Sequence, residues 1–412
     1  HQPRSRCNWF NCGSPPRSWP TATRCGRKRA AAGPPWFQAH LASRDGTWLS
    51  EHALQKQFKG QFGLHSQTVQ ALAQKLSANV ATARALRQAN PAAQYPYRAK
   101  RYQTVPWKQQ AIHLQAGQLV LANGKGQAPL VLALPQRFAS ADIVKCELTW
   151  RADHYELCLT IDTGRVNPPL VNDSKAAGVD LGEVNIAAAV TDAGVGISIS
   201  GRYLRSVNRL RLKRHTALNQ RIQRCTAGSR RHKQLVKAKA RASAAFYRQS
   251  RDVLHKAARQ LANFARAEGV AHLAVGDVRD VANSGDKGRR HNQRMSLWAH
   301  GQFVGYVQDK ARQYGIATEY IGEEYSTRTC SACRHCHPTA PRGRVFTCAG
   351  CGAIISRDGN GAANICSRYR HGEYGHVQVQ SITYLRATEV VLRTTAMLPT
   401  GVGSHGPLGP VV

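Results

Sequence analysis

A short segment of the chain has the sequence Gly178-Val179-Asp180-Leu181-Gly182, and the fold assignment starts from it. Apolar runs in and after this segment are separated by glycines, a pattern that predicts three short neighbouring strands. These runs cover residues 177–180, 186–191 and 197–200. Asp180 stands at the end of the first strand, and a second aspartate, Asp358, lies far downstream before a helix-like segment. Two aspartates placed in this way suggest carboxylates that converge on a metal ion.

Two Cys-x-x-Cys pairs lie between these aspartates, and 14 residues (334–347) separate the pairs. Thiolates in paired knuckles of this kind hold one tetrahedral zinc ion, so the spacing predicts a structural zinc ribbon. Cys336 lies between the pairs as a competing ligand, and we expect it to be a free thiol. The predicted zinc ligands are Cys330, Cys333, Cys348 and Cys351. A zinc ribbon together with a divided carboxylate site indicates a nuclease.

The composition points to a polyanionic partner. The 412 residues include 58 Lys and Arg against 23 Asp and Glu, which gives a net charge of +35 and a pI of about 10.4. This charge favours nucleic acid but says nothing about catalysis, because a ribosomal or chromatin protein would show the same excess. No apolar run approaches the ~18 residues of a membrane span. The 12 cysteines have no disulfide-like framework, so we expect a cytoplasmic, nucleoid-associated protein.

The N-terminal part of the chain divides into three segments. Residues 1–60 are rich in Pro, Gly and Arg and lack periodicity, so we expect a poorly ordered basic arm. Residues 61–95 carry apolar side chains at helical spacing and predict a small helical lobe. In residues 96–170 the period falls toward two, with hairpin turns at 123–124 and 152–153, which predicts an antiparallel β-barrel-like domain.

A strongly basic segment follows the three short strands. About eighteen Lys and Arg face the single acid Asp252 between residues 201 and 260, and Ala227-Gly228-Ser229 interrupts the segment. We expect a basic helical hairpin within 201–262 that contacts phosphates, although charge runs more often form solvated surfaces. The pattern then predicts a strand at 272–276, a helix at 297–314 and a strand at 317–321. From residue 369 onward, we expect a tail.

Three ordered blocks resemble the TnpB proteins of insertion elements, the OrfB family, which are related to compact type V CRISPR effectors. The blocks are Gly178–Ala187, Tyr325–Cys333 and Arg357–Ile365. The resemblance is firm over 176–367 and faint over 95–165. It implies an α/β fold with an RNase H-like RuvC core at 176–325, the zinc ribbon at 326–355 and the last RuvC segment at 356–368. It also implies that 61–95 acts as a recognition lobe and 96–170 as a wedge domain, whereas the tail at 369–412 lies outside the resemblance.

The resemblance further implies an endonuclease that uses a guide RNA to choose double-stranded DNA, with guide RNA and both double-stranded and single-stranded DNA as partners. Magnesium would be the catalytic metal, with Asp180 as the bridging ligand and Asp358 closing the site. A second interpretation of Asp358 is a helix N-cap, a role that aspartate fills well. A nuclease-dead RNA-guided repressor and a strand-joining, DNA-binding transposase are alternative functions.

The sequence does not decide which residue provides the third carboxylate of the site. Gly276 stands where the family carries Glu, and Asp277 follows it on what would be the opposite face of a regular strand. A bulge at Gly276 could turn Asp277 inward. Glu323 or Glu324, at the end of the next predicted strand, could reach the same centre, and we favour Glu323. A site with no third ligand would bind nucleic acid without cutting it.

The first cysteine knuckle also departs from the family pattern. Family members continue Cys-x-x-Cys-Gly, because glycine accepts the left-handed backbone after the second thiolate. Arg334 takes that position here, whereas Gly352 is retained after the second knuckle. We therefore expect roughly 1 kcal/mol of backbone strain at Arg334.

Overall fold

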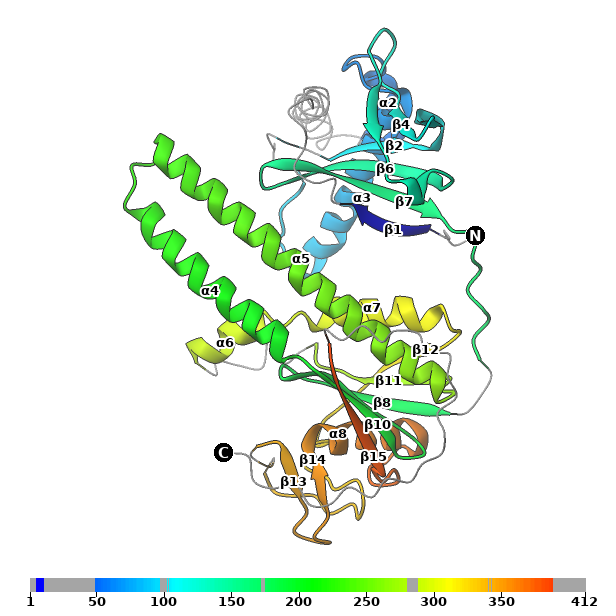
Figure 1. Ribbon diagram of the computed structural model, residues 1–412, viewed down its shortest axis with the longest axis vertical. Coiled ribbons are helices and arrows are strands. Elements are labelled where there is room, and N and C mark those ends of the chain that lie inside the picture. The colour runs from blue at the N-terminus through cyan, green and yellow to red at the C-terminus, as the bar shows by residue number, and fades with distance from the viewer. Residues whose placement is uncertain are drawn as a thin grey trace. The chain divides into compact units, whose positions relative to one another are not determined.

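The computed structural model describes residues 5–10, 49–96, 102, 104–171, 175–279, 288–339, 341 and 343–387 (Figure 1). Most of the predicted N-terminal arm and the end of the predicted tail therefore lie outside the described residues. The chain forms two compact units. The first comprises His1–Val166 with Arg211–Tyr247, and the second comprises Asn167–Leu210 with Arg248–Val412. The basic helical hairpin contributes to both units.

The helical lobe of the first unit consists of two helices, α2 (Glu51–Gln57) and α3 (Ser66–Ala89). Ser50 caps α2, because its hydroxyl oxygen accepts a hydrogen bond from the Ala53 N–H at 3.2 Å. Apolar residues of α3 at helical spacing pack against Leu54 and Phe58. The lobe thus begins before residue 61, within the segment that the sequence predicts as an arm.

The β domain of the first unit is built from two antiparallel sheets that share one core. One sheet has the order β1-β7-β6-β2 and the other the order β3-β4-β5. Trp107 and Tyr155 are buried in the common core with leucines from both sheets. The strands are β1 (Ser5–Phe10), β2 (Val105–Lys108), β3 (Ile112–Gln115), β4 (Gln118–Leu121), β5 (Leu130–Ala133), β6 (Asp142–Arg151) and β7 (His154–Asp162).

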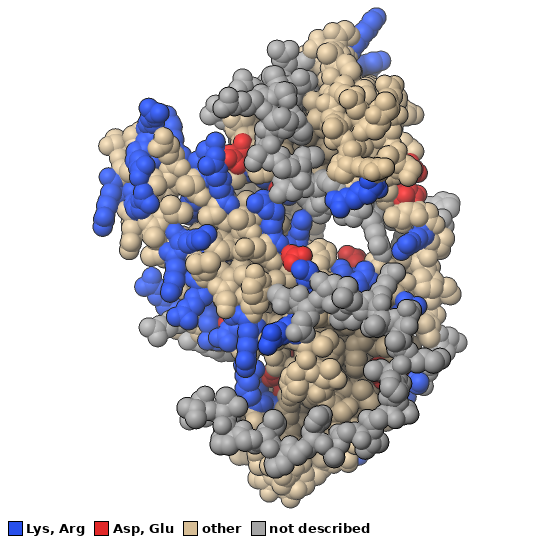
Figure 2. Space-filling view, viewed as in Figure 1, with Lys and Arg blue, Asp and Glu red and all other residues tan. Residues whose placement is uncertain are grey.

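The predicted helical hairpin is present as α4 (Arg202–Gln223) and α5 (Arg230–Ala267). Gly228 in the turn has a φ of +78°, a left-handed conformation that suits glycine. Within the first unit the two helices are joined by His215 and Ser243, whose Nε2 and Oγ atoms lie 3.0 Å apart. Residues 211–247 contain eleven Lys or Arg and no acid, and Figure 2 shows such side chains gathered over these helices.

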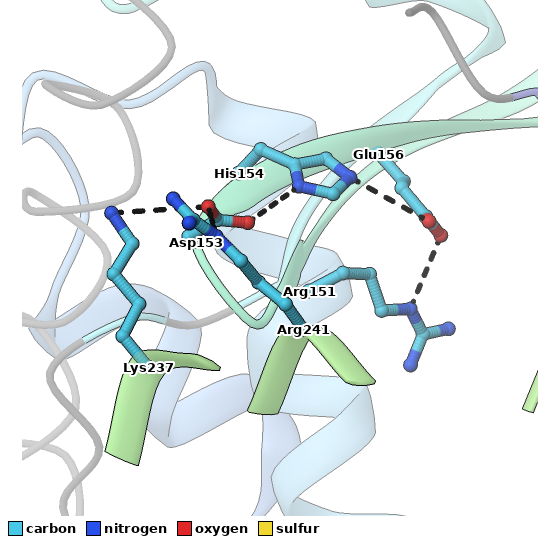
Figure 3. Close-up of polar contacts among 6 residues, drawn as sticks. All are labelled: Arg151, Asp153, His154, Glu156, Lys237 and Arg241. Atoms are coloured by element: carbon cyan, nitrogen blue, oxygen red, sulfur yellow. Dashed lines mark hydrogen bonds and ion pairs between the residues drawn. The ribbon is translucent and has the colours of Figure 1, made fainter. Parts of the chain in front are cut away.

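The turn between β6 and β7 contacts the basic face of α5 (Figure 3). Asp153 forms ion pairs with Arg241 and with Lys237, the latter at 3.8 Å. His154 Nδ1 lies 3.0 Å from the same carboxylate. Burial acts to raise the pKa of Asp153, but the hydrogen bonds from His154 and Arg241 and the neighbouring cations lower it overall. One acidic turn thereby anchors part of a strongly basic helix.

The second unit is centred on a mixed six-stranded sheet with the order β12-β11-β8-β9-β10-β15. Strands β8, β9 and β10 form an antiparallel meander, whereas β11, β12 and β15 are added in parallel. Their bounds are β8 (Ala176–Leu181), β9 (Asn185–Thr191), β10 (Val195–Ser200), β11 (His272–Gly276), β12 (Ala317–Ile321) and β15 (Ser381–Arg386). Strand β15 lies in the segment that the sequence predicts as a tail.

Helices cover both faces of this sheet. The C-terminal part of α5 and helix α7 (His300–Arg312) bury their apolar side chains against one face. Helix α8 (Arg357–His371) packs on the other face, where Gly178 permits a very close approach. A Cβ atom at Gly178 would lie only 2.2 Å from the Ala362 carbonyl oxygen. The short α6 (Arg289–Ser296) and the two-stranded β13 (Val345–Thr347) and β14 (Ile354–Ser356) complete the described elements of this unit. The predicted α/β class is confirmed.

Candidate metal centres

The first candidate metal centre is built around Asp180, at the end of β8. Burial raises the pKa of Asp180 well above its usual value, and the nearby carboxylates of Asp358 and Glu323 raise it further. Gly361 of α8 leaves room for the carboxylate, because a Cβ atom there would lie 3.1 Å from Asp180 Oδ2. Carboxylates from two distant segments therefore lie near one half-buried aspartate.

Asp358 is held in this cluster by neighbours on both sides. Its Oδ2 accepts a hydrogen bond from Asn185 Nδ2 at 2.8 Å, and Arg344 and Arg357 lie within ion-pair distance at 3.6 and 3.3 Å. The N-cap of α8 is Ser356, whose hydroxyl oxygen accepts from the Gly359 N–H at 3.4 Å. The N-cap interpretation of Asp358 is therefore wrong, and its side chain is directed toward β9 instead.

Glu323 follows β12 and turns back toward β11. Its Oε2 would lie 2.5 Å from a Cβ atom at Gly276, so this carboxylate fills the space that a side chain at 276 would need. Burial raises the pKa of Glu323, and the charges of Asp277 and Glu324 raise it further. Glycine at 276 and glutamate at 323 are thus complementary in shape.

The two other acids that the sequence leaves open are engaged elsewhere. Asp277 is partly exposed, and hydrogen bonds from Arg279 lower its pKa although burial opposes them. The register of β11 and β12 runs without a shift through Gly276, so the bulge that would turn Asp277 inward is absent from these strands. Glu324 pairs with Arg368 at 3.0 Å and has a lowered pKa from hydrogen bonds to its carboxylate.

The second candidate centre is formed by the four predicted cysteines. Their four sulfur atoms all lie within 4.8 Å of one another. Such a cluster of potential metal ligands is found once among the residues that the structure describes. Burial acts to raise the pKa of the Cys348 thiol, but hydrogen bonds from the Cys351 and Gly350 N–H groups and from His337 lower it to about 6. Four converging thiols suit tetrahedral zinc, and Cys336 lies outside the group.

The two knuckles have matching backbones despite their different sequences. The Arg334 N–H donates to the Cys330 carbonyl and the Gly352 N–H to the Cys348 carbonyl, each at 3.0 Å. The φ angles of Arg334 and Gly352 are +66° and +72°. The predicted left-handed conformation of Arg334 is confirmed.

Two buried asparagines connect the ribbon to the acidic centre. Asn360 and Asn364, one turn apart on α8, donate hydrogen bonds to the backbone carbonyls of Ser326 and Thr329 at 2.6–3.4 Å. Asn360 Oδ1 also accepts from the Ser331 N–H at 2.9 Å. Sequence reasoning missed this role, although polar residues with i, i+4 spacing among alanines were the available signal.

The chain is similar to known families in two segments. Residues 156–282 match the family described as probable transposase, and residues 300–365 match the Cas12f1-like TNB domain family. No curated protein sequence matches the chain.

One solved structure supports the fold assignment. The fold resembles a chain of the Cas12f1–sgRNA–target DNA complex with a TM-score of 0.61 and 16% identity, over 84% of this chain and 83% of that one. A chain of a CRISPR–Cas12f ternary complex matches with a TM-score of 0.40 and 16% identity, over 84% and 80%. At this identity, the first likeness concerns the fold alone. Among the described helices, none has both the length and the apolar character needed to cross a bilayer.

Proposed function

We propose that this chain, which is TnpB-like and related to type V CRISPR effectors, is a transposon-encoded, RNA-guided DNA endonuclease with a RuvC-type site. The observation that carries the proposal is the convergence of Asp180, Glu323 and Asp358 from β8, the segment after β12, and α8. A half-buried aspartate beside two other carboxylates is unfavourable unless a cation compensates their charges.

The donor set fits magnesium, which prefers carboxylate oxygens. Asp180, Glu323 and Asp358 would hold it, and magnesium when bound supplies an activated water and charge stabilisation for phosphodiester hydrolysis. Asn185 orients the Asp358 carboxylate through its hydrogen bond. Asp277 and Glu324, which pair with arginines, have no role in this proposal.

The regions outside the acidic centre would bind the nucleic-acid partners. Guide RNA and the double- and single-stranded target DNA carry phosphates, and the acid-free basic face of residues 211–247 is suited to them. Base pairing with the guide would select the DNA, and the recognition (61–95) and wedge (96–170) segments would bind the heteroduplex by its shape. Structural zinc in the ribbon would keep the α8 end of the acidic site in place. Such a protein would act in the cytoplasm on nucleoid DNA.

The test compares three matched acid-to-amide variants. RNA that co-purifies with the protein is sequenced, and the purified complex is offered matching DNA with Mg²⁺. We expect cleavage by the parent protein and by Asp277→Asn, and loss of cleavage with retained DNA binding in Asp180→Asn and Glu323→Gln. Cleavage by Glu323→Gln together with inactivity of Asp277→Asn would reverse the assignment of the third carboxylate.

The same assays on the parent protein also distinguish the alternative functions. A parent that binds matching DNA through a defined RNA but never cuts it would be the nuclease-dead repressor. A parent that joins DNA strands without RNA would be a transposase. Either result would contradict the proposal.

A further inference from the structure

The residue after the two glutamates, Tyr325, combines exposure with an unfavourable backbone. Its side chain is 58% exposed, and its φ of +67° lies in the left-handed region that aromatic residues rarely adopt. Ala116 and Ala152 share this conformation in hairpin turns between strands, and Arg334 does so in a cysteine knuckle. Tyr325 lies in neither setting, and strained backbone of this kind concentrates at functional sites.

The left-handed backbone at Tyr325 directs the Glu323 and Tyr325 side chains to different places. The Ser326 N–H donates to the Glu323 carbonyl at 3.0 Å, and the Tyr325 carbonyl accepts from the Thr329 N–H at 3.0 Å. The chain reverses between these two turns. As a result, the Glu323 carboxylate packs against Gly276 while the Tyr325 ring faces solvent.

The exposed ring is nevertheless braced. The guanidinium carbon of Arg328 lies 4.9 Å from the centroid of the Tyr325 ring. Arg328 is itself fixed, because it donates through Nε to the His337 carbonyl at 2.9 Å and through Nη2 to the Pro338 carbonyl. A rigid aromatic ring loses little conformational entropy when it binds a flat partner.

The same turn borders the acidic cluster. A Cβ atom at Gly361 would lie 3.1 Å from Asp180 Oδ2 on one side and 3.6 Å from Thr327 Cγ2 on the other. Thr327, two residues after Tyr325, is thus separated from the half-buried aspartate by a single glycine. A strand whose phosphate reaches these carboxylates would have bases near the turn.

We propose that Tyr325, braced by Arg328, stacks on an unpaired base of the DNA strand that enters the acidic centre. The proposal rests on the function proposed above and adds a strand-binding residue to it. Stacking on a tyrosine ring accepts any base, as a guided enzyme requires, because every base offers a π-face. The net charge of +35 and the arginine behind the ring favour a nucleic acid over a protein partner.

The test uses single-stranded DNA that carries 2-aminopurine, whose fluorescence falls when the base stacks. It is performed without added Mg²⁺ and without a chelator, so that the readout does not depend on cleavage and the zinc is retained. We expect quenching by the parent protein, Tyr325→Phe and Tyr325→Trp. Tyr325→Leu should lose the quenching and bind the strand about 5- to 150-fold more weakly, the range for removal of one stacked base. Tyr384→Leu, which removes a 66% exposed tyrosine of β15, is the matched control and should behave as the parent.

A glycine variant separates a binding role from a structural one. Tyr325→Gly relieves the left-handed backbone, so it should keep or raise the thermal stability while losing the quenching. Quenching that persists in both Tyr325→Leu and Tyr325→Gly, or its absence from the parent, overturns the inference. A parent that never cleaves DNA but shows Tyr325-dependent quenching supports the stacking site and contradicts the proposed endonuclease.

Discussion

Individual acidic residues show where sequence reasoning succeeds and where it stops. Asp180 and Asp358 could be predicted as site residues because each follows or begins a recognisable element. Among Glu323, Glu324 and Asp277, the sequence favours Glu323 but local patterns do not decide the choice. It depends on Gly276 leaving a space on β11 and on the chain after β12 turning into that space. Such complementarity between segments distant in sequence appears only when they are packed together.

Replacing Asp180 by Asn should stabilise the metal-free protein and abolish its cleavage activity. The pKa of Asp180 is raised on folding, so its contribution to stability is greatest at low pH and is lost as the pH rises through the folded-state pKa. At neutral pH the half-buried charge therefore lowers the free energy of unfolding, and the neutral amide removes this penalty. Each kcal/mol gained corresponds to an increase of about 2–4 °C in Tm.

Thermal melts without added Mg²⁺, and without a chelator that would remove the zinc, check this prediction at several pH values. The difference in Tm between Asp180→Asn and the parent should grow from acidic to alkaline pH, and saturating Mg²⁺ should reduce it by stabilising only the parent. A variant that is less stable than the parent at pH 8 would show that Asp180 does not carry an uncompensated charge.

At the scale of elements, the close contact between β8 and α8 depends on glycine, which has no side chain, at position 178. The Gly178→Ala variant would place its Cβ atom 2.2 Å from both the Ala362 carbonyl oxygen and the Cys366 nitrogen, and neither backbone group can move independently. We expect the free energy of unfolding to fall by about 1–3 kcal/mol or more. Gly305→Ala in α7 is the control, because nothing lies within 4 Å of its Cβ position. It should be neutral or stabilise by about 0.5–1 kcal/mol in urea denaturation.

The zinc ribbon offers another matched pair of variants. Cys348→Ser removes one of the four converging thiols and should lower the zinc content well below one ion per chain. It should also lower Tm, because metal binding and folding of such ribbons are coupled. Cys336→Ser should retain the zinc. Metal analysis by mass spectrometry distinguishes the two, and equal zinc loss in both would place Cys336 among the ligands.

Elements with a strong period were predictable, and marginal ones were not. Helices α3, α4 and α5 and strands β8 to β10 could be predicted because each repeats its apolar residues at a clear spacing. Strand β15 has four exposed residues and none that is buried, and its parallel partner β10 lies far away in sequence, so neither burial nor a hairpin turn indicates it. Helix α2 buries Leu54 alone within its span, too little to give a period.

On the scale of the whole molecule, the charge predicts how binding responds to salt. The logarithm of the RNA association constant should fall linearly with the logarithm of the salt concentration. The slope should be about −0.7 for each phosphate contacted on a single strand. The double variant Arg230→Ala/Lys233→Ala on α5 should reduce this slope by about 1.4. Lys145→Ala is the control, because Lys145 pairs with Glu147 at 3.1 Å outside the basic face. Filter binding between 50 and 300 mM salt measures both, and an unchanged slope in the double variant would exclude these two side chains from the interface.

The order of strands in the six-stranded sheet has a consequence for synthesis on the ribosome. The meander β8 to β10 is complete by residue 200, whereas α8 and β15, which cover and extend it, end at residues 371 and 386. At translation rates of about 5–20 residues per second, this delay amounts to about 10–40 s. During that time the nascent chain carries the apolar surface of Ala176, Ala188 and Val190 without its helix. Slower elongation would prolong this exposure, so codon usage between the meander and α8 should affect the yield of folded protein.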